Sequence, residues 1–203
     1  MNFCPNCGAE LRHEVPEGDD RPRGVCPACR VIHYENPKLV VGCFIEPPDG
    51  SDRLLLCKRA IQPALGRWTP PAGYLELGES ARAGARRETW EEARARVRIT
   101  APFVEFDLSH IGQVYRLYHA VLLGDEFSSG PESSDVRWYD LDKIPIDDLA
   151  FPVIHFAVRL YIQDRAAGER GVHLGTLVWD GEGSRWSAES YQLDDHIFVP
   201  FSS

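Results

Sequence analysis

Apolar residues are sparse over the first 35 residues of the chain and form regular runs only afterwards. Two early runs, LVVGCFIE over residues 39–46 and RLLLCKRA over residues 53–60, are separated by the turn sequence PPDGSD. Short apolar runs bounded by turn residues are typical of buried strands, so we expect two strands joined as a hairpin. Further strands are predicted where later segments alternate or run apolar: VRI after residue 96, VEFDLSHIG, QVYRLYHAVLLG and VRWYDL.

Two segments have the spacing of helices instead. One covers about residues 80–94, and the other, AFPVIHFAVRLYIQD over residues 150–164, ends near Gly168. We expect the second helix to cover a sheet, and we expect His155 within it to be a packed or surface residue. The tail from residue 171 returns to strand-like character.

Composition and charge narrow the class of protein. The chain has 203 residues, of which 43% are hydrophobic and 26% are charged, as is typical of a soluble globular protein with a real core. Its formal net charge of −9 argues against non-specific binding of nucleic acid through a basic surface. It has no run of 18 apolar residues and no apolar signal region at its N-terminus. We therefore expect a cytoplasmic protein with neither a membrane nor a nucleic-acid partner.

Four cysteines near the N-terminus form two pairs with the spacing of metal ligands. Two residues separate Cys4 from Cys7 and Cys26 from Cys29, and 18 residues separate the pairs. This pattern predicts a four-thiolate zinc site, because the segment between the pairs is too polar to fold around a core of its own. Two disulfides, which a reducing compartment disfavours, and a redox-active pair are the alternatives. Zinc bound by four cysteines is closed to substrate, so the predicted role is structural.

The remaining cysteines and the nearest histidine have simpler interpretations. Cys43 and Cys57 lie inside apolar runs, and we expect both to be buried thiols. We expect His33, which follows the second cysteine pair, to be a surface residue and not a zinc ligand.

The predicted helix at 80–94 carries a concentration of acidic residues. Glu88, Glu91 and Glu92 fall within an arc of about 100° on the helix surface. Like charges this close repel unless a cation neutralises them, and Mg²⁺ prefers carboxylate oxygens. The competing interpretation is a solvated helix in which Arg94 pairs with Glu91 and Arg96 pairs with Glu92.

The sequence around this helix favours the magnesium interpretation. Ala81, Gly84 and Ala85 lie on the carboxylate side of the helix, where small residues let it approach a neighbouring backbone closely. The segment resembles the Nudix box, G-x5-E-x7-R-E-U-x-E-E-x-G-U with U apolar, through Gly73, Glu79, Arg87, Glu88, Glu91 and Glu92. Three later positions depart from the box: Thr89 and Ala95 at the apolar positions and Arg94 at the second glycine.

The resemblance implies a fold and a division into domains. Nudix domains have a layered α/β/α sandwich with a mixed sheet, and here a small zinc ribbon would precede it. We expect the ribbon over residues 1–35, the Nudix hydrolase domain over 36–170, and a strand-like C-terminal extension over 171–203 packed on that domain.

The resemblance also implies roles for individual residues. Glu79 and Arg87 would join the loop before the helix to the helix itself through an ion pair. The implied ligands of catalytic Mg²⁺ or Mn²⁺ are the backbone carbonyl of Ala72 and the carboxylates of Glu88, Glu91, Glu92 and Glu132. Asp135 is the alternative to Glu132, and a merely solvated acidic loop is the alternative to both. The alternative role for one of these glutamates is that of general base on the attacking water, and the sequence does not assign which one.

The pairing of a zinc ribbon with a Nudix box resembles two groups of pyrophosphatases. One comprises the bacterial NADH pyrophosphatases, and the closer one comprises Nudix hydrolases linked to FAD and ADP-ribose. The tail signature of the NADH group, S-Q-P-W-P-F-P-x-S, is missing, and Leu149-Ala150-Phe151-Pro152 stands where a comparable loop would lie. We therefore expect Mg²⁺-dependent cleavage of ADP-ribose or FAD, with NADH hydrolysis and a non-catalytic nucleotide-binding regulatory module as alternatives.

Substrate and subunit contacts are less defined by the sequence. Tyr74 and Arg59 are the candidate substrate-binding residues, and adenine stacking would use Tyr74, Phe106 or Tyr115. By resemblance we expect a homodimer that acts on a small nucleotide substrate. The preferred substrate, the number of catalytic metals and any wider role of the ribbon stay open at this stage.

Overall fold

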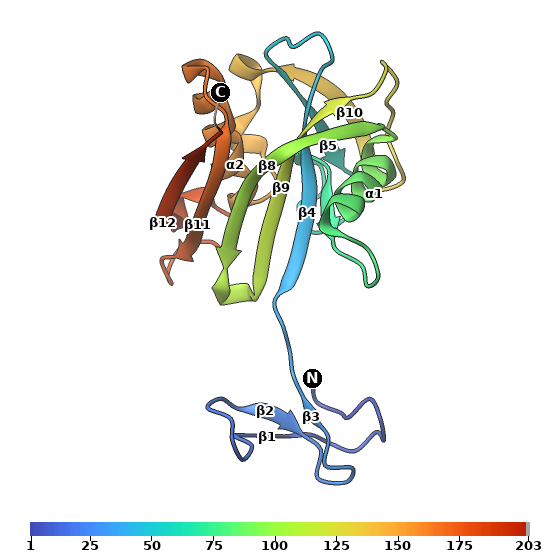
Figure 1. Ribbon diagram of the computed structural model, residues 1–203, viewed down its shortest axis with the longest axis vertical. Helices are drawn as coiled ribbons and strands as arrows, with labels where there is room; N and C mark the ends of the chain where they lie inside the picture. Colours follow the sequence, from blue (N-terminus) through green and yellow to red (C-terminus); the bar gives the residue numbers. More distant parts are fainter. Residues whose placement is uncertain (202–203) are drawn as a thin grey trace. The chain divides into compact units, whose positions relative to one another are not determined.

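The computed structural model describes residues 1–201 and divides into two compact units, Met1–Pro37 and Lys38–Ser203 (Figure 1). The smaller unit is a three-stranded antiparallel sheet in the order β1-β2-β3. Its strands are β1 (Arg12–Glu14), β2 (Arg23–Val25) and β3 (Ile32–His33). Its buried cluster holds only Cys4, Leu11 and Cys26, with Ala9 packed against them. So small a core does not stabilise a fold of this length by itself.

The larger unit is organised around a six-stranded mixed sheet in the order β12-β11-β8-β9-β4-β7. The pairs β4–β9 and β11–β8 are parallel, and the other neighbours are antiparallel. The strands are β4 (Lys38–Glu46), β7 (Ala72–Tyr74), β8 (Val97–Leu108), β9 (Gln113–Leu122), β11 (Gly171–Trp179) and β12 (Tyr191–Pro200). The last two strands extend this sheet at one edge, so the C-terminal segment is part of it.

A second sheet of three strands, in the order β10-β5-β6, corrects one expectation from the sequence. β5 (Arg53–Arg59) pairs with β10 (Ser133–Asp140) and with β6 (Trp68–Thr69). The predicted hairpin between the two early apolar runs is therefore wrong, because β4 and β5 belong to different sheets. Apolar runs report burial, but they do not report which strand becomes the partner.

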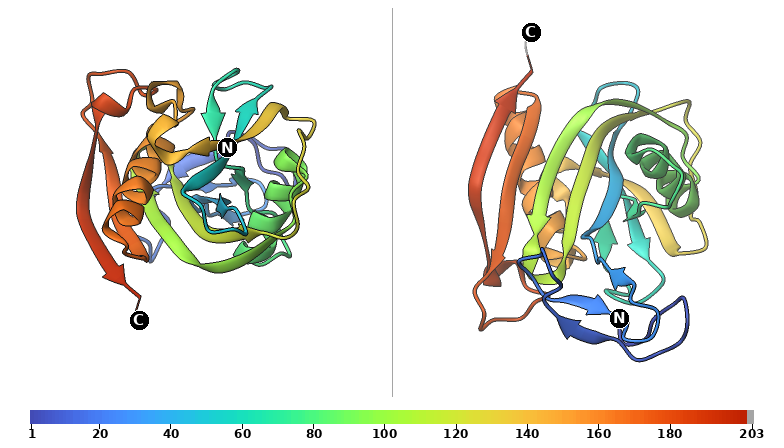
Figure 2. Two further views of the ribbon diagram at one scale, coloured as in Figure 1. Left: turned by 90° about the horizontal axis from the view of Figure 1, so that it is seen from above. Right: turned by 60° about the horizontal axis from the view of Figure 1, so that its bottom comes forward.

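Two helices cover opposite faces of the large sheet, as Figures 1 and 2 show: α1 (Ala81–Ala93) and α2 (Pro152–Ala167). Alternate residues of β4 enter two separate cores. Phe44 packs in the core that holds Ala157 and Tyr161 of α2, whereas Cys43 packs in the core that holds Ala85 of α1. The sandwich expected from the sequence is confirmed, and its double coverage explains why β4 reads as a continuous apolar run.

Both helices begin and end with local signals. The Ser80 hydroxyl accepts a hydrogen bond from the Ala83 N–H at 3.2 Å, and Arg94 ends α1 in a left-handed conformation with φ 49°. α2 begins with Pro152 and ends at Gly168, which has φ 69°. Four short 3₁₀ helices complete the chain: η1 (Ser109–Ile111), η2 (Leu141–Lys143), η3 (Ile146–Asp148) and η4 (Ala188–Ser190). Within residues 1–201, no helix is both long and apolar enough to cross a membrane.

Candidate functional site

Helix α1 presses two of its carboxylates against the strand that precedes it. Glu92 is only 5% exposed, and its Oε2 accepts a hydrogen bond of 3.2 Å from the N–H of Ala72 in β7. Glu88 lies beside Gly73, and a Cβ atom at Gly73 would overlap the Glu88 carboxylate. The leading glycine of the box is therefore needed because the backbone and the carboxylate approach each other closely.

The same close approach recurs one turn earlier on the helix. A Cβ atom at Gly84 would lie 2.7 Å from Glu79 Oε1 and 2.8 Å from the Leu75 side chain. The small residues on this side of α1 let the helix lie against the loop that follows β7. The loop and the helix thus hold the carboxylates in place from both sides.

Burial gives these carboxylates unusual proton affinities. Burial raises the pKa of Glu92 to about 8, the negative charges of Glu88 and Glu132 add to this rise, and the Ala72 N–H and Arg59 oppose it. Burial also raises the pKa of Glu88, against the opposing effect of Arg87. Within residues 1–201, Glu92 forms no ion pair. A hard divalent cation fits this oxygen-rich group, because it would replace the protons that the buried carboxyl groups otherwise retain.

Arg87 forms ion pairs with three glutamates of the segment over residues 73–92. Its guanidinium lies 2.7 Å from Glu79 Oε1, 2.7 Å from Glu88 Oε1 and 2.9 Å from Glu91 Oε2. It also donates a hydrogen bond of 3.0 Å to the carbonyl oxygen of Tyr74. One arginine thus joins the loop after β7 to three carboxylates and sets where Glu88 points.

The two ion pairs of the competing interpretation, Glu91 with Arg94 and Glu92 with Arg96, are not formed within residues 1–201, although Arg87 does pair with Glu91. The guanidinium groups of Arg94 and Arg96 instead lie over the Trp90 ring, at 5.6 and 5.5 Å from its centroid. The arginines that follow the helix are therefore turned away from the carboxylates.

The loop before β10 contributes the fourth carboxylate. The Gly130 N–H donates to the carbonyl oxygen of Glu92 at 2.9 Å, and a Cβ atom at Gly130 would overlap the helix backbone. Glu132 lies on the same loop. Its negative charge adds to the rise in the pKa of both Glu88 and Glu92, for which burial is the larger cause. Asp135 forms an ion pair with Arg137 instead. Glu132 is thus the loop candidate whose charge acts on Glu88 and Glu92, although within residues 1–201 the carboxylate oxygens do not converge as closely as the cysteine sulfur atoms do.

The predicted substrate-binding residues lie in different environments. Phe106 is completely buried, so its nomination for adenine stacking is wrong, and Tyr115 is only 9% exposed. Tyr74 is exposed, and its hydroxyl accepts a hydrogen bond of 2.9 Å from Gln113. Arg59 influences the pKa of Glu92 and so lies near the carboxylates.

Two aromatic residues beside Arg59 were missed at the sequence level. The Arg59 guanidinium lies 5.2 Å from the ring centroid of Phe151, and that ring lies 6.3 Å from the ring of Trp186. Trp186 is 62% exposed, on the loop between β11 and β12. An exposed tryptophan in the polar segment GEGSRW was the only signal in the sequence.

The four N-terminal cysteines meet at one point. Their sulfur atoms all lie within 4.8 Å of one another, with Cys4 and Cys29 at 3.6 Å and Cys7 and Cys26 at 3.4 Å. A tetrahedral zinc ion at about 2.3 Å from each sulfur would hold them about 3.8 Å apart. A disulfide would need about 2.05 Å, so the disulfide alternative is not formed and all four cysteines are free.

The surroundings of the sulfur atoms favour metal binding. The Cys29 N–H bonded to the Cys26 sulfur lowers the pKa of Cys26 to about 6, which favours the thiolate that zinc requires. Against backbone hydrogen bonds from Ala9 and Val31, the neighbouring cysteine sulfur atoms raise the pKa of Cys7 and of Cys29. His33 Nε2 lies 3.3 Å from the Cys4 sulfur, so His33 contacts the cluster instead of lying free at the surface as expected. Cys43 and Cys57 are both buried, as the sequence predicts, and burial raises the pKa of each.

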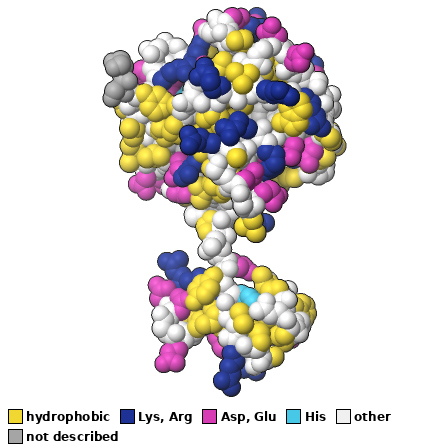
Figure 3. Space-filling view, turned by 45° about the vertical axis from the view of Figure 1, so that its right-hand side comes forward, with side chains coloured by type: hydrophobic (Ala, Val, Ile, Leu, Met, Phe, Trp, Pro, Cys, Tyr) yellow, Lys and Arg dark blue, Asp and Glu magenta, His cyan; other side chains and the backbone are white. Residues whose placement is uncertain are grey.

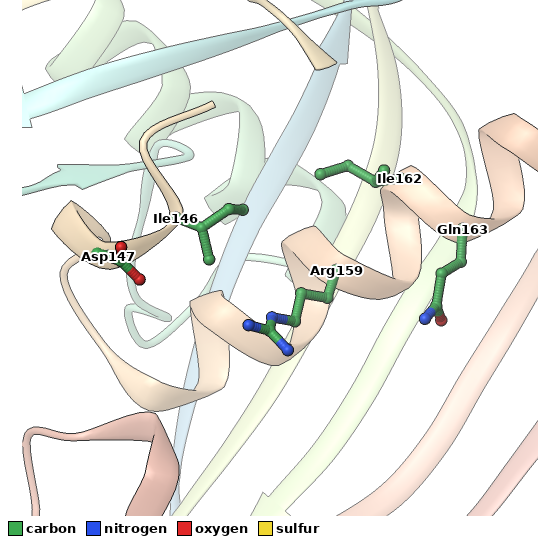
Figure 4. A pocket seen from close by; sticks show the side chains of 5 residues that line it. All are labelled: Ile146, Asp147, Arg159, Ile162 and Gln163. Carbon is green, nitrogen blue, oxygen red and sulfur yellow. The ribbon is translucent and has the colours of Figure 1, made fainter. Parts of the chain in front are cut away.

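A shallow hollow elsewhere on the larger unit carries none of this chemistry. It is lined by Arg159, Ile162 and Gln163 of α2 together with Ile146 and Asp147 of η3 (Figure 4). None of the predicted site residues is among them. The site must therefore be located by its carboxylates and not by the shape of the surface.

Two family models match the chain in succession. The Nudix N-terminal zinc-ribbon model matches residues 2–35, and the NUDIX domain model matches residues 36–159. The second match covers more than half of the chain and contains every carboxylate described above.

Individual relatives agree with these models. The NAD-capped RNA hydrolase NudC of Stutzerimonas stutzeri is 28% identical over 165 residues, which cover 80% of this chain and 56% of that protein. The NudC protein of Pseudomonas aeruginosa is 27% identical over 180 residues, covering 84% of this chain and 59% of that protein. The chain thus spans somewhat over half the length of these curated relatives.

Solved structures share the fold. A crystal structure of a NUDIX hydrolase from Nitrosomonas europaea is 47% identical, with a TM-score of 0.82, and covers 87% of this chain and 98% of that one. An ADP-ribose pyrophosphatase from Streptococcus suis, 20% identical with a TM-score of 0.55, covers 68% of this chain and 99% of that one and shares the fold alone. Because the domain model matches more than half of the chain and includes the acidic helix, the chain belongs to the Nudix family of hydrolases.

Proposed function

We propose that this enzyme cleaves, with Mg²⁺, the pyrophosphate bond of a nucleoside diphosphate linked to a second moiety, and that ADP-ribose or FAD is its preferred substrate. The observation that carries the proposal is Glu92, a buried carboxylate next to Glu88 that forms no ion pair within residues 1–201. An isolated buried carboxylate is costly unless it retains a proton or meets a cation. A cation bound by these residues would neutralise the buried negative charge. The same cation would stabilise the charge that develops on the phosphoryl oxygens.

The reaction requires charge stabilisation more than covalent chemistry. The oxygen of an attacking water forms a bond to one phosphorus, and the bond from that phosphorus to the bridging oxygen breaks. A bound Mg²⁺ supplies stabilisation of the phosphoryl charge and orientation of the water. Glu88, Glu92 and Glu132 would hold the ion, with the carbonyl of Ala72, while Arg87 fixes Glu88 and Glu91 through its ion pairs. The proton released by the water requires a carboxylate base within this group.

The second moiety would contact the aromatic residues beside Arg59. Phe151 and Trp186 lie next to that guanidinium, and an exposed indole offers a stacking surface for a planar base. Within the proposed pair such a surface favours FAD, whose second moiety carries a planar ring, over ADP-ribose, whose second moiety is a sugar without a flat π face.

An NAD-type substrate is the second candidate. Several relatives are named NAD-capped RNA hydrolase, which is at odds with the expectation that no nucleic acid is bound. The missing tail signature favours ADP-ribose or FAD, whereas these names favour NAD, free or at the 5′ end of an RNA. We also retain the homodimer as a proposal, to be checked by sedimentation.

The experiment compares hydrolysis of ADP-ribose, FAD, NADH, an NAD-capped RNA and a nucleotide sugar, each with Mg²⁺ and with EDTA. We expect activity only with the metal. Glu92→Gln is expected to lower kcat by about 10³-fold, equivalent to ~4 kcal/mol of transition-state stabilisation.

The matched control is Glu76→Gln, because Glu76 is an exposed glutamate of the same loop and helix region without an ion pair. We expect this variant to retain full activity. Undiminished hydrolysis by Glu92→Gln would reject the proposal, and nucleotide binding without any hydrolysis would establish the regulatory-module alternative instead.

A further inference from the structure

The outer side of α1 carries a basic stripe around one exposed tryptophan. Arg82, Arg86, Trp90 and Arg94 follow one another at intervals of four residues, which places them along one side of the helix. Trp90 is 42% exposed. We call this group, together with Arg96 and Arg98 beyond the end of the helix, the Trp90 surface.

The arginines of the Trp90 surface have no acidic partners. Within residues 1–201, none of Arg82, Arg86, Arg94, Arg96 and Arg98 forms an ion pair, whereas Arg87 on the same helix forms three. Figure 3 brings the α1 side of the larger unit forward and shows Lys and Arg side chains grouped there beside hydrophobic ones. This concentration stands out in a chain whose net charge is −9.

Intrachain contacts account for Arg94 and Arg96, which lie over the Trp90 ring, but not for the arginines earlier on the helix. Like charges four residues apart on a helix repel each other and destabilise it slightly. An exposed indole gains little from its position, since nearly half of it remains in water. The repulsion disappears when a polyanion lies along the stripe, so the arrangement suits a ligand better than it suits the fold.

The combination of a flat ring and guanidinium groups defines the chemistry of that ligand. Proteins that bind single-stranded nucleic acid stack bases on exposed aromatic rings and pair basic side chains with phosphates. Arg94 and Arg96 lie over the Trp90 ring at 5.6 and 5.5 Å, so the charges and the ring already form one surface. From residue 82 to residue 94 a helix rises about 18 Å, which is long enough for several consecutive phosphates. An acidic protein segment would pair with the arginines but would have no use for the ring.

We propose that the Trp90 surface binds single-stranded RNA, with a base stacked on Trp90 and phosphates paired with the arginines around it. This inference rests on the second candidate substrate above, because an RNA with NAD at its 5′ end has a strand that needs a binding surface outside the carboxylate group. The net charge predicts the average field around the molecule, whereas the stripe sets the local one.

The test is binding of a fluorescent single-stranded 12-nucleotide RNA to the full chain, measured by anisotropy at low and moderate salt. Trp90→Ala is expected to weaken binding about tenfold, because stacking contributes about 1–3 kcal/mol per base, and Trp90→Phe is expected to restore most of it. Arg86→Glu and Arg96→Glu are each expected to reduce the salt dependence of binding by about one to two ions. The matched control is Arg159→Glu, since Arg159 is exposed on α2 and forms no ion pair within residues 1–201.

A separate readout distinguishes this inference from the proposed function. Glu92→Gln is expected to bind the RNA as the wild type does, although its hydrolysis is lost. The Trp90 and Arg86 variants are expected to hydrolyse free ADP-ribose at the wild-type rate, which also shows that they are folded.

Three outcomes would overturn the inference. The first is no binding of the strand by the wild type at low salt. The second is an equal loss from Arg159→Glu and Arg86→Glu, which would mean that only net charge matters. The third is competition by poly-glutamate or duplex RNA as strong as by the single strand, with Trp90→Ala unchanged, since neither competitor offers a free base to the ring.

Discussion

The cysteine cluster and the acidic helix are both expected metal sites, yet they are built in opposite ways. The four sulfur atoms converge in a unit whose buried cluster is three residues, whereas Glu88 and Glu92 lie between a helix and a strand supported by two large cores. The first site would hold its unit together, because little else does. The second site exists only because the surrounding unit is already folded.

The difference also shows in the acid–base behaviour of the ligands. A backbone N–H lowers the pKa of Cys26 to about 6, so one ligand of the ribbon is prepared for metal before the ion arrives. Burial raises the pKa of Glu92 to about 8, so this carboxyl group resists ionisation unless a cation is bound. A closed site of four protein ligands suits a permanent ion, and an open carboxylate site suits an ion that is exchanged during turnover.

Removal of zinc is expected to give the largest effect, because it would unfold the smaller unit and leave the larger one folded. Cys26→Ser removes one ligand, and binding of structural zinc contributes about 10–16 kcal/mol to small zinc folds. We expect residues 1–37 to unfold while the larger unit keeps its melting temperature. Zinc content, proteolysis and calorimetry provide the measurement. If the ribbon stayed folded without zinc, the smaller unit would not depend on its metal for stability.

A methyl group at Gly73 is expected to give the next largest effect. In Gly73→Ala the added Cβ atom overlaps the Glu88 carboxylate, so the helix or the strand must move. We expect a loss of about 1–3 kcal/mol in stability and a fall in kcat, with no change in zinc content. Denaturant unfolding and initial rates measure the two effects.

Gly66→Ala provides the matched control for that substitution. Gly66 has no neighbouring atoms that a Cβ would meet, although its positive φ of 80° adds some strain of its own. We expect it to cost stability without lowering kcat. A Gly73→Ala enzyme with unchanged kcat would show that the close contact does not position Glu88.

The smallest expected effect links pH to magnesium. Burial raises the pKa of Glu92 in the folded protein to about 8, above the ordinary value of about 4.3 for the unfolded chain. Between pH values of about 4.3 and about 8 the folded, metal-free protein therefore binds a proton at Glu92 that the unfolded chain does not. This proton binding stabilises the fold, and the stabilisation is lost as the pH rises toward about 8. Because Mg²⁺ binds the ionised form, we expect it to raise the melting temperature by about 2–4 °C more at pH 8 than at pH 6.

Thermal unfolding with EDTA and with Mg²⁺ at both pH values measures this linkage. Glu92→Gln, which has no ionisable group at that position, is expected to remove most of the pH dependence. Equal stabilisation by Mg²⁺ at pH 6 and pH 8 would contradict the assignment of Glu92 as a buried ligand.

The structure also shows where patterns in the sequence mislead. Arg94 and Arg96 follow the carboxylates at pairing distance along the chain, yet both lie over Trp90 because the helix ends at Arg94 and turns away. Phe106 looks like a stacking residue but is completely buried, while Trp186, from a segment without periodicity, is exposed beside Phe151. Periodicity reports which residues are buried in a regular element, and it carries no information about loops that meet in space.

The sequence by itself determined what depends on neighbours along the chain: the two cysteine pairs, the bounds of α1 and α2, and the carboxylates that share one face of α1. Helical spacing and ligand spacing are local, so they are readable from one sequence. Only the tertiary structure decided that β5 leaves β4 for β10, and that Asp135 pairs with Arg137 whereas the charge of Glu132 acts on Glu92. Those choices depend on packing between segments far apart in the chain, where many pairings bury similar apolar area and only the assembled cores select one.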